Sequence, residues 1–318
     1  MHETPADWLP ARAALHPTGL YFSLREIGPA QLQDPFMQQT LARVSARESF
    51  VHIAREDLGK GAEGCAPAGL IFHVARCGST LISQLLKQLD GLVVYAEPLP
   101  VNEILVPPHT WSRQERVAAL RSLSVAFARH ARKPYVLKFT SWNTLFCELV
   151  AEAFPHSPWI LNFRDPVEVG VSLLSRPPGW LWESGEPSGT FSGFIDPEKV
   201  STSREEYVAL LYGAFCRAAS RLDPRRGRLV PYTSLPAAVW QSVAPHFSRA
   251  IDDEQRRRMT ETARADAKAP LGKAAAFSSD VAAKQAAASA ELRRAVEALA
   301  RPQLAELERL HGMSLNGP

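Results

Sequence analysis

One stretch near the first quarter of the chain constrains the fold more than any other feature. Residues 71–74 form an apolar run, residues 75–78 form a short loop of small and polar residues, and Ser79 and Thr80 stand where a helix would begin. Apolar side chains then recur at helical spacing, at Leu81, Ile82, Leu85, Leu86 and Leu89. The stretch predicts a buried strand, a tight loop and a helix. Backbone N–H groups at the start of such a helix suit a phosphate.

Apolar runs and helical patterns alternate along the chain after this loop. Strands are predicted at residues 71–74, 92–95, 135–137, 159–163 and 228–232, and helices at residues 113–131, 142–154, 166–175 and 201–222. This alternation predicts an α/β fold, with a P-loop-type parallel β-sheet flanked by helices on both faces. Pro231 predicts an edge position for the last strand. Ligands of such folds bind beyond the carboxyl ends of the strands.

The pattern divides the chain into three regions. Residues 1–66 are expected to be an N-terminal appendage packed on the core, with a short amphipathic helix near residues 35–44. Residues 67–250 form the α/β core, and residues 251–318 form a mainly helical C-terminal extension. Within the core, the Pro-, Gly- and Ser-rich segment 176–197 carries four aromatic residues, Trp180, Trp182, Phe191 and Phe194. They form either a lid that admits an apolar or sugar-like acceptor or a buried anchor for the loop.

Composition excludes several classes of function. The net charge of +3, without a dense basic run, favours a small anionic ligand over nucleic acid. The 4 cysteines lie far apart without a CxxC pair, so neither a zinc site nor a disulfide framework is expected, and a reducing compartment is favoured. An apolar leader and a membrane-length apolar run are both absent from the sequence, which predicts a cytoplasmic protein without a membrane span. Oligomeric state stays open, and a homodimer is compatible with the sequence.

The loop departs from the Walker A pattern of kinases and ATPases. His73 stands in the place of the first Gly, and Ser79 stands in the place of the Lys. Because that Lys contacts the outer phosphates of a nucleoside triphosphate, hydrolysis of such a nucleotide is disfavoured. An ordinary strand-to-helix turn without a ligand is the alternative for this loop.

A second set of polar residues follows the predicted strand 159–163. Arg164 ends that strand, and Ser172 lies eight residues further on, two turns into the next helix. An Arg fork and a hydroxyl group suit a second phosphate. In the alternative interpretation Arg164 pairs with Asp165 or Glu168, and Ser172 is a helix-surface residue.

The two sets together resemble the sulfotransferase family that uses 3′-phosphoadenosine 5′-phosphosulfate (PAPS). Residues 76–80, Arg-Cys-Gly-Ser-Thr, are similar to its 5′-phosphosulfate loop, and Arg164, Pro166 and Ser172 match its 3′-phosphate element. The resemblance covers about residues 69–250. It implies sulfuryl transfer from PAPS to a hydroxyl or amine of a small-molecule acceptor, with 3′,5′-adenosine bisphosphate (PAP) as the other product and no metal.

Further matches assign roles to single residues. The pair Glu97-Pro98 looks like the Glu-Pro of the carbohydrate-sulfating branch, and Tyr232 is similar to a family Tyr near the adenine. Arg76 takes the position of the loop Lys and would stabilise the leaving 5′-phosphate, and Lys138 matches a Lys near the transferred group. The remaining loop residues would cradle the phosphate; they are Cys77, Gly78, Ser79 and Thr80.

The general base is the assignment for which this sequence departs from the cytosolic branch of the family. Thr140 stands where the cytosolic branch has a His, so Glu97 is the better candidate, with a pKa expected to be raised by partial burial. Its alternative is a helix-capping carboxylate or one that pairs with Arg76. The alternative for Lys138 is a solvated lysine at a strand end.

Other residues near these motifs and in the C-terminal region also receive roles. The family's C-terminal Arg-Lys-Gly segment has no match, and Lys268 or Lys273 could replace it at the 3′-phosphate. His73 is read as a hydrogen-bonded core residue, and His109 could line the acceptor pocket. The thiol pKa of Cys77 is expected to fall at the helix N-terminus, although no His at matching spacing supports a catalytic thiol.

Two other functions compete with sulfuryl transfer. One is a P-loop small-molecule kinase, which Ser79 in the Lys place disfavours. The other is a nucleotide-binding protein of the same fold that has lost its chemistry. The identity of the acceptor is left open, with residues 102–111 and the aromatic segment as its expected determinants.

Overall fold

A five-stranded parallel sheet forms the centre of the computed structural model, which describes residues 7–106, 111–183, 186–187, 189–195, 203–265, 267–268 and 280–312. The strand order is β10-β7-β4-β6-β5, and every neighbouring pair is parallel. The bounds are β4 (Gly69–His73), β5 (Val93–Ala96), β6 (Tyr135–Lys138), β7 (Trp159–Phe163) and β10 (Gly227–Pro231). The predicted α/β class and the edge position of the last strand are therefore confirmed.

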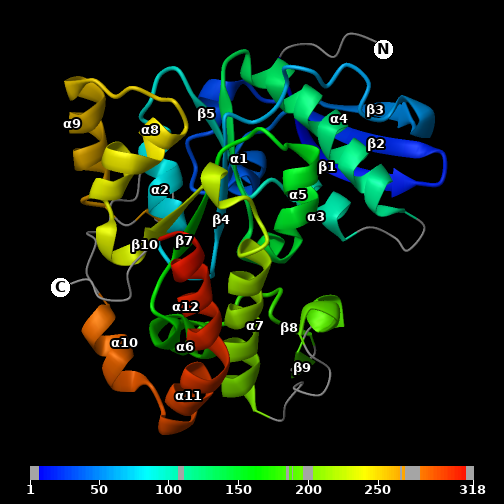
Figure 1. Ribbon diagram of the computed structural model, residues 1–318. Helices are drawn as coiled ribbons and strands as arrows, with labels where there is room; N and C mark the ends of the chain where they lie inside the picture. The colour runs from blue at the N-terminus through cyan, green and yellow to red at the C-terminus, as the bar shows by residue number, and fades with distance from the viewer. Residues whose placement is uncertain are drawn as a thin grey trace.

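Helices cover both faces of this sheet because successive strand residues point to opposite sides. Ile71, Val136 and Ile160 belong to one core cluster, which includes residues of α2 (Ser79–Leu86), α8 (Ala244–His246) and α9 (Asp253–Thr262). The alternate residues Phe72, Leu137 and Leu161 belong to a larger cluster with residues of α4 (Arg113–Ala131), α5 (Cys147–Ala153) and α7 (Arg204–Ala219). Figure 1 shows α2, α8 and α9 on one side of the sheet and α4 and α5 on the other.

Local sequence signals account for most helix bounds. Helix α6 (Pro166–Ser175) begins at a proline, and the Asp165 side chain accepts hydrogen bonds from two first-turn N–H groups. Ser112 and Ser203 cap α4 and α7 in the same way. The helix predicted over 142–154 is divided: residues 141–146 form a 3-10 helix, and α5 follows. Helix α3 (Leu99–Leu105), which begins directly after Pro98, was not predicted.

The N-terminal region contains a sheet that the sequence analysis missed. Strands β1 (Trp8–His16), β2 (Gly19–Glu26) and β3 (Glu48–Ala54) form an antiparallel meander, with β1 against α3 and α4. The Glu103 side chain of α3 accepts hydrogen bonds from Arg12 and from the Ala13 N–H group, which ties the meander to the core. Helix α1 (Met37–Arg43) confirms the predicted short helix.

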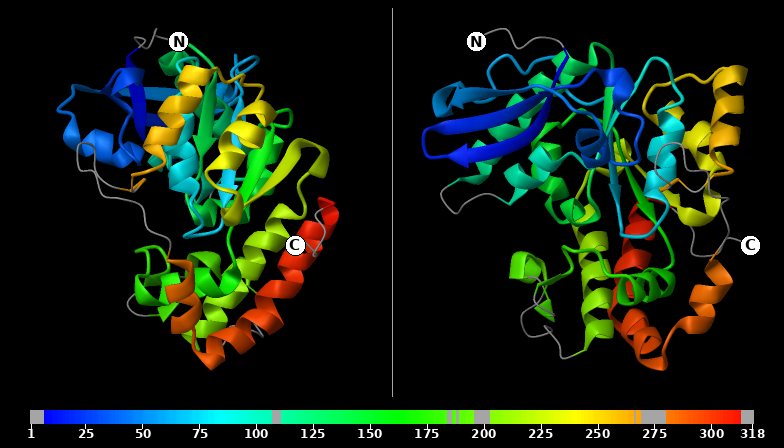
Figure 2. Two further views of the ribbon diagram at one scale, coloured as in Figure 1. Left: turned by 90° about the vertical axis from the view of Figure 1, so that its left-hand side faces the viewer. Right: turned by 180° about the vertical axis from the view of Figure 1, so that it is seen from behind.

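The C-terminal helices lie beyond the carboxyl ends of the strands. They are α10 (Val281–Ala287), α11 (Ala290–Ala295) and α12 (Arg301–Leu310), with a π-helix at Val296–Ala300, and they pack on α6 and α7 (Figure 2). A Cβ atom at Gly170 of α6 would lie 2.7 Å from Leu292 Cδ1, so glycine allows α11 to approach closely. Within the described ranges, none of the helices combines the length and the apolar character that crossing a bilayer requires.

The remaining elements are short. The segment after α6 contains a two-residue hairpin, β8 (Trp182–Glu183) with β9 (Glu186–Pro187), and a 3-10 helix at Gly189–Phe194. Further 3-10 turns occur at Pro29–Gln31, Arg55–Asp57, Pro224–Arg226 and Tyr232–Ser234, and a π-helix at Val239–Val243 leads into α8.

Candidate functional site

The loop between β4 and α2 has a backbone that only particular residues tolerate. Gly78 is the N-cap of α2 with φ of 87°, and Arg76 has φ of 60°. A Cβ atom at Gly78 would lie 2.9 Å from Leu235 Cδ1 and 3.0 Å from Tyr232 Cδ2, so both the backbone angle and the close approach require glycine. Unlike α4, α6 and α7, α2 has no side-chain cap. The Leu81 N–H group donates to the Gly78 carbonyl oxygen at 2.9 Å, and the N–H groups of Ser79 and Thr80, which precede it, are the anion donors expected from the sequence. Residues 76–80 are called the α2 terminus below.

A cavity of about 260 Å³ lies at the α2 terminus. It brings together the whole predicted loop, Glu97 and Lys268, which are separated by up to 192 positions in the chain. Its other lining residues are Phe36, His73, Ala75, Thr140, Ser141, Pro178 and Trp180. Cationic and hydrogen-bonding groups therefore share this cavity with an apolar wall.

The two cationic side chains that line the cavity, Arg76 and Lys268, both have a lowered pKa. Arg76 Nη2 donates a hydrogen bond to the Arg176 carbonyl oxygen at 2.6 Å. Burial, followed by the charge of Arg176, lowers the pKa of Arg76, and burial, followed by Arg76 and Lys138, lowers the pKa of Lys268. A guanidinium stays charged under any of these influences. The cavity consequently favours an anionic ligand.

Glu97 and Lys138 form an ion pair at the ends of neighbouring strands. The Glu97 N–H group donates to the Lys138 carbonyl oxygen at 2.7 Å, and the Glu97 carboxylate accepts a hydrogen bond from the Lys138 ammonium group. Glu97 has φ of 54°, which turns its side chain out of the strand path. Lys138 is only 1% exposed and lies 5.2 Å from the Phe36 ring centre, so the solvated alternative for this lysine is wrong. In the described contacts Glu97 pairs with Lys138, not with Arg76. Its role as a base stays a prediction.

The structure corrects one expectation about the loop and confirms another. Burial raises the pKa of the Cys77 thiol to about 12, against the expected decrease, and the thiol donates to the Val74 carbonyl and to Asn162 Oδ1. His73 is the expected hydrogen-bonded core residue, with Nδ1 and Nε2 each 2.8 Å from a backbone carbonyl oxygen, of Val74 and Phe139. Burial, then Lys138, lowers the pKa of His73 to about 4.

The second predicted anion site is filled by carboxylates of the chain itself. Arg164, 5% exposed, donates from Nε to Glu168 Oε2 at 2.5 Å and from Nη2 to Asp280 Oδ1 at 2.6 Å. The alternative interpretation, in which Arg164 pairs with Glu168, is thus realised. Burial would lower the pKa of Arg164, but the bonds to Asp280 and Glu168 outweigh it and raise the pKa. Asp165, Arg164 and Glu168 together are called the α6 terminus below.

Tyr232 connects the two termini. Its ring centre lies 4.1 Å from Arg164 Cζ, and the same ring approaches Gly78 closely enough to exclude a Cβ atom. The Tyr212 hydroxyl also donates to the Arg164 carbonyl oxygen at 2.8 Å. The guanidinium of Arg164 and the loop at Gly78 therefore both lie against the Tyr232 ring, at the same edge of the sheet.

Other predicted residues have mixed placements. Lys268 lines the α2-terminus cavity together with Arg76, and its contact with a 3′-phosphate stays a prediction. Ser172 is partly exposed on α6. His109 and Lys273 lie outside the described residues. Asp280 and Lys284, which surround Arg164, were missed, since an Asp and a Lys in an Ala-rich helical tail give no sequence signal.

The aromatic segment serves mainly as an anchor. Phe191 is 2% exposed and contacts Trp142 and Trp180, with ring centres 5.9 Å and 5.7 Å away. Trp182 packs on Tyr207 at 5.1 Å, and Phe194 packs on Phe146 at 4.9 Å. Trp180 alone of the four aromatic residues lines the described cavity at the α2 terminus.

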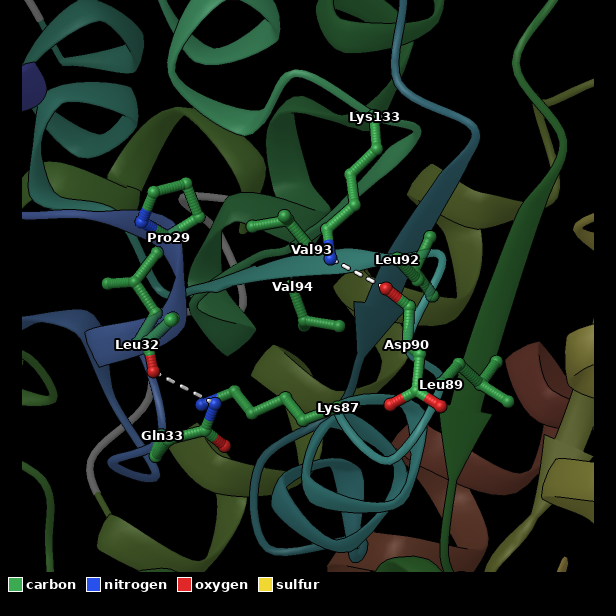
Figure 3. Close-up of a pocket in the computed structure, with 11 residues that line it drawn as sticks. Pro29, Leu32, Gln33, Lys87, Leu89, Asp90, Leu92, Val93, Val94 and Lys133 are labelled. Carbon is green, nitrogen blue, oxygen red and sulfur yellow. Dashed lines mark hydrogen bonds between the residues drawn. The ribbon is translucent and has the colours of Figure 1, made fainter. Parts of the chain in front are cut away.

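A second cavity lies at the amino end of β5, away from these residues (Figure 3). It has a volume of about 200 Å³ and contains Lys87 and Lys133, whose ammonium groups donate to the backbone carbonyls of Asp34 and Asp90. Burial lowers the pKa of Lys87 to about 8. Both lysines are tied to backbone oxygens, and ligands of parallel sheets bind at the other end of the strands. Among the described residues, no group of His, Cys, Asp or Glu side chains could hold a metal ion.

Comparison with solved structures gives several bacterial sulfotransferases. A sulfotransferase from Mycobacterium avium matches at 16% identity and a TM-score of 0.46, over 80% of this chain and 79% of that chain. One from Alicyclobacillus acidocaldarius matches at 14% identity and a TM-score of 0.46, over 78% and 97%. The sulfotransferase domain from the curacin biosynthetic pathway matches at 15% identity and a TM-score of 0.45, over 74% and 97%.

No protein-family model matches the sequence, and no curated protein is detectably similar to it. Likenesses at this level do not assign chemistry, so any activity has to be argued from the residues of the site.

Proposed function

We propose that the protein is a sulfotransferase that moves a sulfuryl group from PAPS to a hydroxyl or amine of a small-molecule acceptor. The observation that carries the proposal is the α2-terminus cavity, where an uncapped helix N-terminus, Arg76 and Lys268 meet the Glu97 carboxylate. Arg164, beside Tyr232, supplies a second cation at the same edge of the sheet. A ligand with two anionic ends would use both.

The residues of the α2 terminus would hold and polarise the donor. The N–H groups of the first helical turn and the hydroxyls of Ser79 and Thr80 would bind phosphate oxygens, and Arg76 would stabilise the charge that grows on the leaving oxygen. PAPS supplies the activated sulfuryl group. The family's 3′-phosphate element corresponds to Arg164 and Ser172, with Tyr232 near the adenine.

Glu97 would serve the acceptor. Its carboxylate would take the acceptor proton while the acceptor oxygen or nitrogen bonds to sulfur and the bond from sulfur to the phosphate oxygen breaks. Lys138, buried and paired with Glu97, would fix the direction of that carboxylate. Phe36, Pro178 and Trp180 offer an apolar wall beside it.

Titration of the protein with PAP, with and without magnesium, tests the proposal. We expect PAP to bind without magnesium and more tightly than ATP. Tight binding of ATP with magnesium and none of PAP would instead identify a kinase.

Glu97→Gln separates chemistry from binding. We expect a loss in kcat of about a hundredfold with unchanged PAP affinity, whereas Glu152→Gln, at an exposed pair with Arg113, should change neither. PAP binding with no turnover of any acceptor would instead indicate a protein that has lost its chemistry.

A further inference from the structure

A carboxylate from the C-terminal helices lies between two cations at the α6 terminus. Asp280 Oδ1 is 2.6 Å from Arg164 Nη2, and Asp280 Oδ2 is 2.7 Å from Lys284 Nζ. The side chains of Arg164 and Lys284 are only 5% and 14% exposed, whereas that of Asp280 is 49% exposed. Asp280 thus lies between two cations that are nearly buried, and Asp280 itself is the most exposed of the three side chains.

Asp280 is not used as a helix cap, although it has the position of one. It is the N-cap residue of α10, yet its side chain makes no cap hydrogen bond. Asp165 and Asp252 occupy the same position in α6 and α9, and both accept hydrogen bonds from first-turn N–H groups. The carboxylate of Asp280 is directed at the two cations instead of at the first-turn N–H groups of α10.

The electrostatics agree with this direction. Burial would raise the pKa of Asp280, but hydrogen bonds from Lys284 and Arg164 outweigh it and lower the pKa. Asp280 is therefore ionised at neutral pH. Glu168 of α6, with a side chain 7% exposed, holds Arg164, which directly precedes that helix's N-cap. Asp280, already 49% exposed, is the partner that can move into water, where hydration offsets part of the lost ion pairing.

We propose that Lys284 is a second phosphate-binding cation beside Arg164 and that Asp280 is an internal competitor for both. The Asp280 carboxylate holds the place that a phosphate group of the bound ligand takes. This inference rests on the proposed function for the identity of the ligand, whose 3′-phosphate is the group concerned. A phosphate monoester carries about −1.5 to −2 charges and three acceptor oxygens, against one charge on Asp280, so it displaces the carboxylate toward solvent.

The inference makes the C-terminal helices part of the binding site. Arg164 and Asp280 are 116 positions apart, and α10 reaches Arg164 because it packs on α6. Gln285 of the same helix donates to Glu168 Oε1 at 3.1 Å and to Asp165 Oδ1 at 3.2 Å, which keeps α10 in place when Asp280 moves.

The test is calorimetric titration of the full chain with PAP and with 5′-AMP, which lacks the 3′-phosphate. We expect Asp280→Asn to tighten PAP binding about tenfold, because a partly exposed competing ion pair is removed. Binding of 5′-AMP should change less than about twofold. Adding Lys284→Met to Asp280→Asn should remove the gain for PAP only. Asp90→Asn, at an exposed pair with Arg258, is the matched control and should change neither affinity.

Each other outcome has a distinct meaning. PAP binding that is equal in the original protein and in Asp280→Asn overturns the inference and leaves the proposed function standing. An equal gain for PAP and 5′-AMP also overturns it, because the effect is then not specific to the 3′-phosphate. If neither protein binds PAP, the proposed function is rejected and the inference falls with it. Thermal unfolding of each variant without nucleotide shows whether a loss of binding reflects a loss of structure.

Discussion

The two helix N-termini at the carboxyl ends of neighbouring strands β4 and β7 differ in how the chain uses them. Helix α2 begins at Gly78 without a side-chain cap, beside a cavity. Helix α6 follows Asp165, which caps it, and two further carboxylates, Glu168 and Asp280, bind Arg164. Both helices have the same dipole direction relative to the sheet. The comparison shows that two helix starts with the same dipole direction differ in what lies beside them, which is a cavity at α2 and carboxylates of the chain itself at α6.

The two arginines differ for a related reason. Arg76 is partly exposed, and its described hydrogen bond goes to one backbone carbonyl, so its guanidinium keeps further donors for an anion. Arg164 is 5% exposed, and a buried charge requires partners inside the protein. One arginine is available to a ligand, and the other must exchange a partner before it can bind one.

Replacing Arg164 should cause the largest loss of stability. Arg164→Ala leaves Glu168 buried without its partner, and we expect unfolding free energy measured in urea to fall by about 3–5 kcal/mol. Arg225→Ala, at a side chain 88% exposed, is the control and should change stability by less than about 0.5 kcal/mol. A loss at Arg164 as small as at Arg225 would remove the distinction between the two termini.

Replacing Arg76 should affect chemistry without affecting stability. For Arg76→Ala we expect sulfuryl transfer to fall by about 10²–10³-fold, as when one donor to a developing charge is removed, with the urea midpoint unchanged. Arg176→Ala is the matched control, because Arg176 contributes its backbone carbonyl to the contact with Arg76. Similar losses of rate in both variants would show that overall charge, not position, matters.

The glycine at the α2 terminus can be tested by adding a methyl group. Gly78→Ala combines a positive φ with contact against Leu235 and Tyr232, and we expect a loss of about 2 kcal/mol together with weaker PAP binding. Gly61→Ala has the positive φ without any neighbour, and Gly91→Ala has neither. The three losses should decrease in that order. Equal losses at Gly78 and Gly61 would mean that the approach of Tyr232 is unimportant.

Acid should destabilise the core beneath the α2 terminus. Because the pKa of His73 is lowered from an ordinary 6.5 to about 4, the unfolded chain binds more protons than the folded protein between these values. Stability therefore falls as the pH decreases through this window, by about 1 kcal/mol between roughly pH 7 and pH 5.5. His73→Gln should remove this part of the pH dependence in urea titrations, and His52→Gln, at an exposed site, should not. An unchanged pH dependence in His73→Gln would show that His73 is not responsible.

Strong local signals predicted the central part of the fold well. The strand at residues 159–163 and the helix at residues 166–175 have the predicted bounds, because a continuous apolar run and a proline in the first turn leave little choice. The N-terminal meander was missed, since its strands are pinned by pairing and by contacts with α3 and α4 more than by their own pattern.

At the site, the sequence predicted which residues gather but not how they are partnered. The loop and Glu97 do line one cavity. The pKa of the Cys77 thiol follows its burial instead of the helix dipole, and Arg164 is held by Glu168 and Asp280. These properties depend on distances across the fold, which motif spacing does not contain.

By itself, the sequence determined the alternation of strands and helices, the glycine at the start of α2 and the positions of the cations at strand ends. These features depend on neighbours within a few residues, through hydrophobic periodicity and backbone geometry. Only the tertiary structure decided which cation faces a cavity and which is held by carboxylates. Asp280 reaches Arg164 from 116 positions away because α10 packs on α6, and burial then makes that partnership strong.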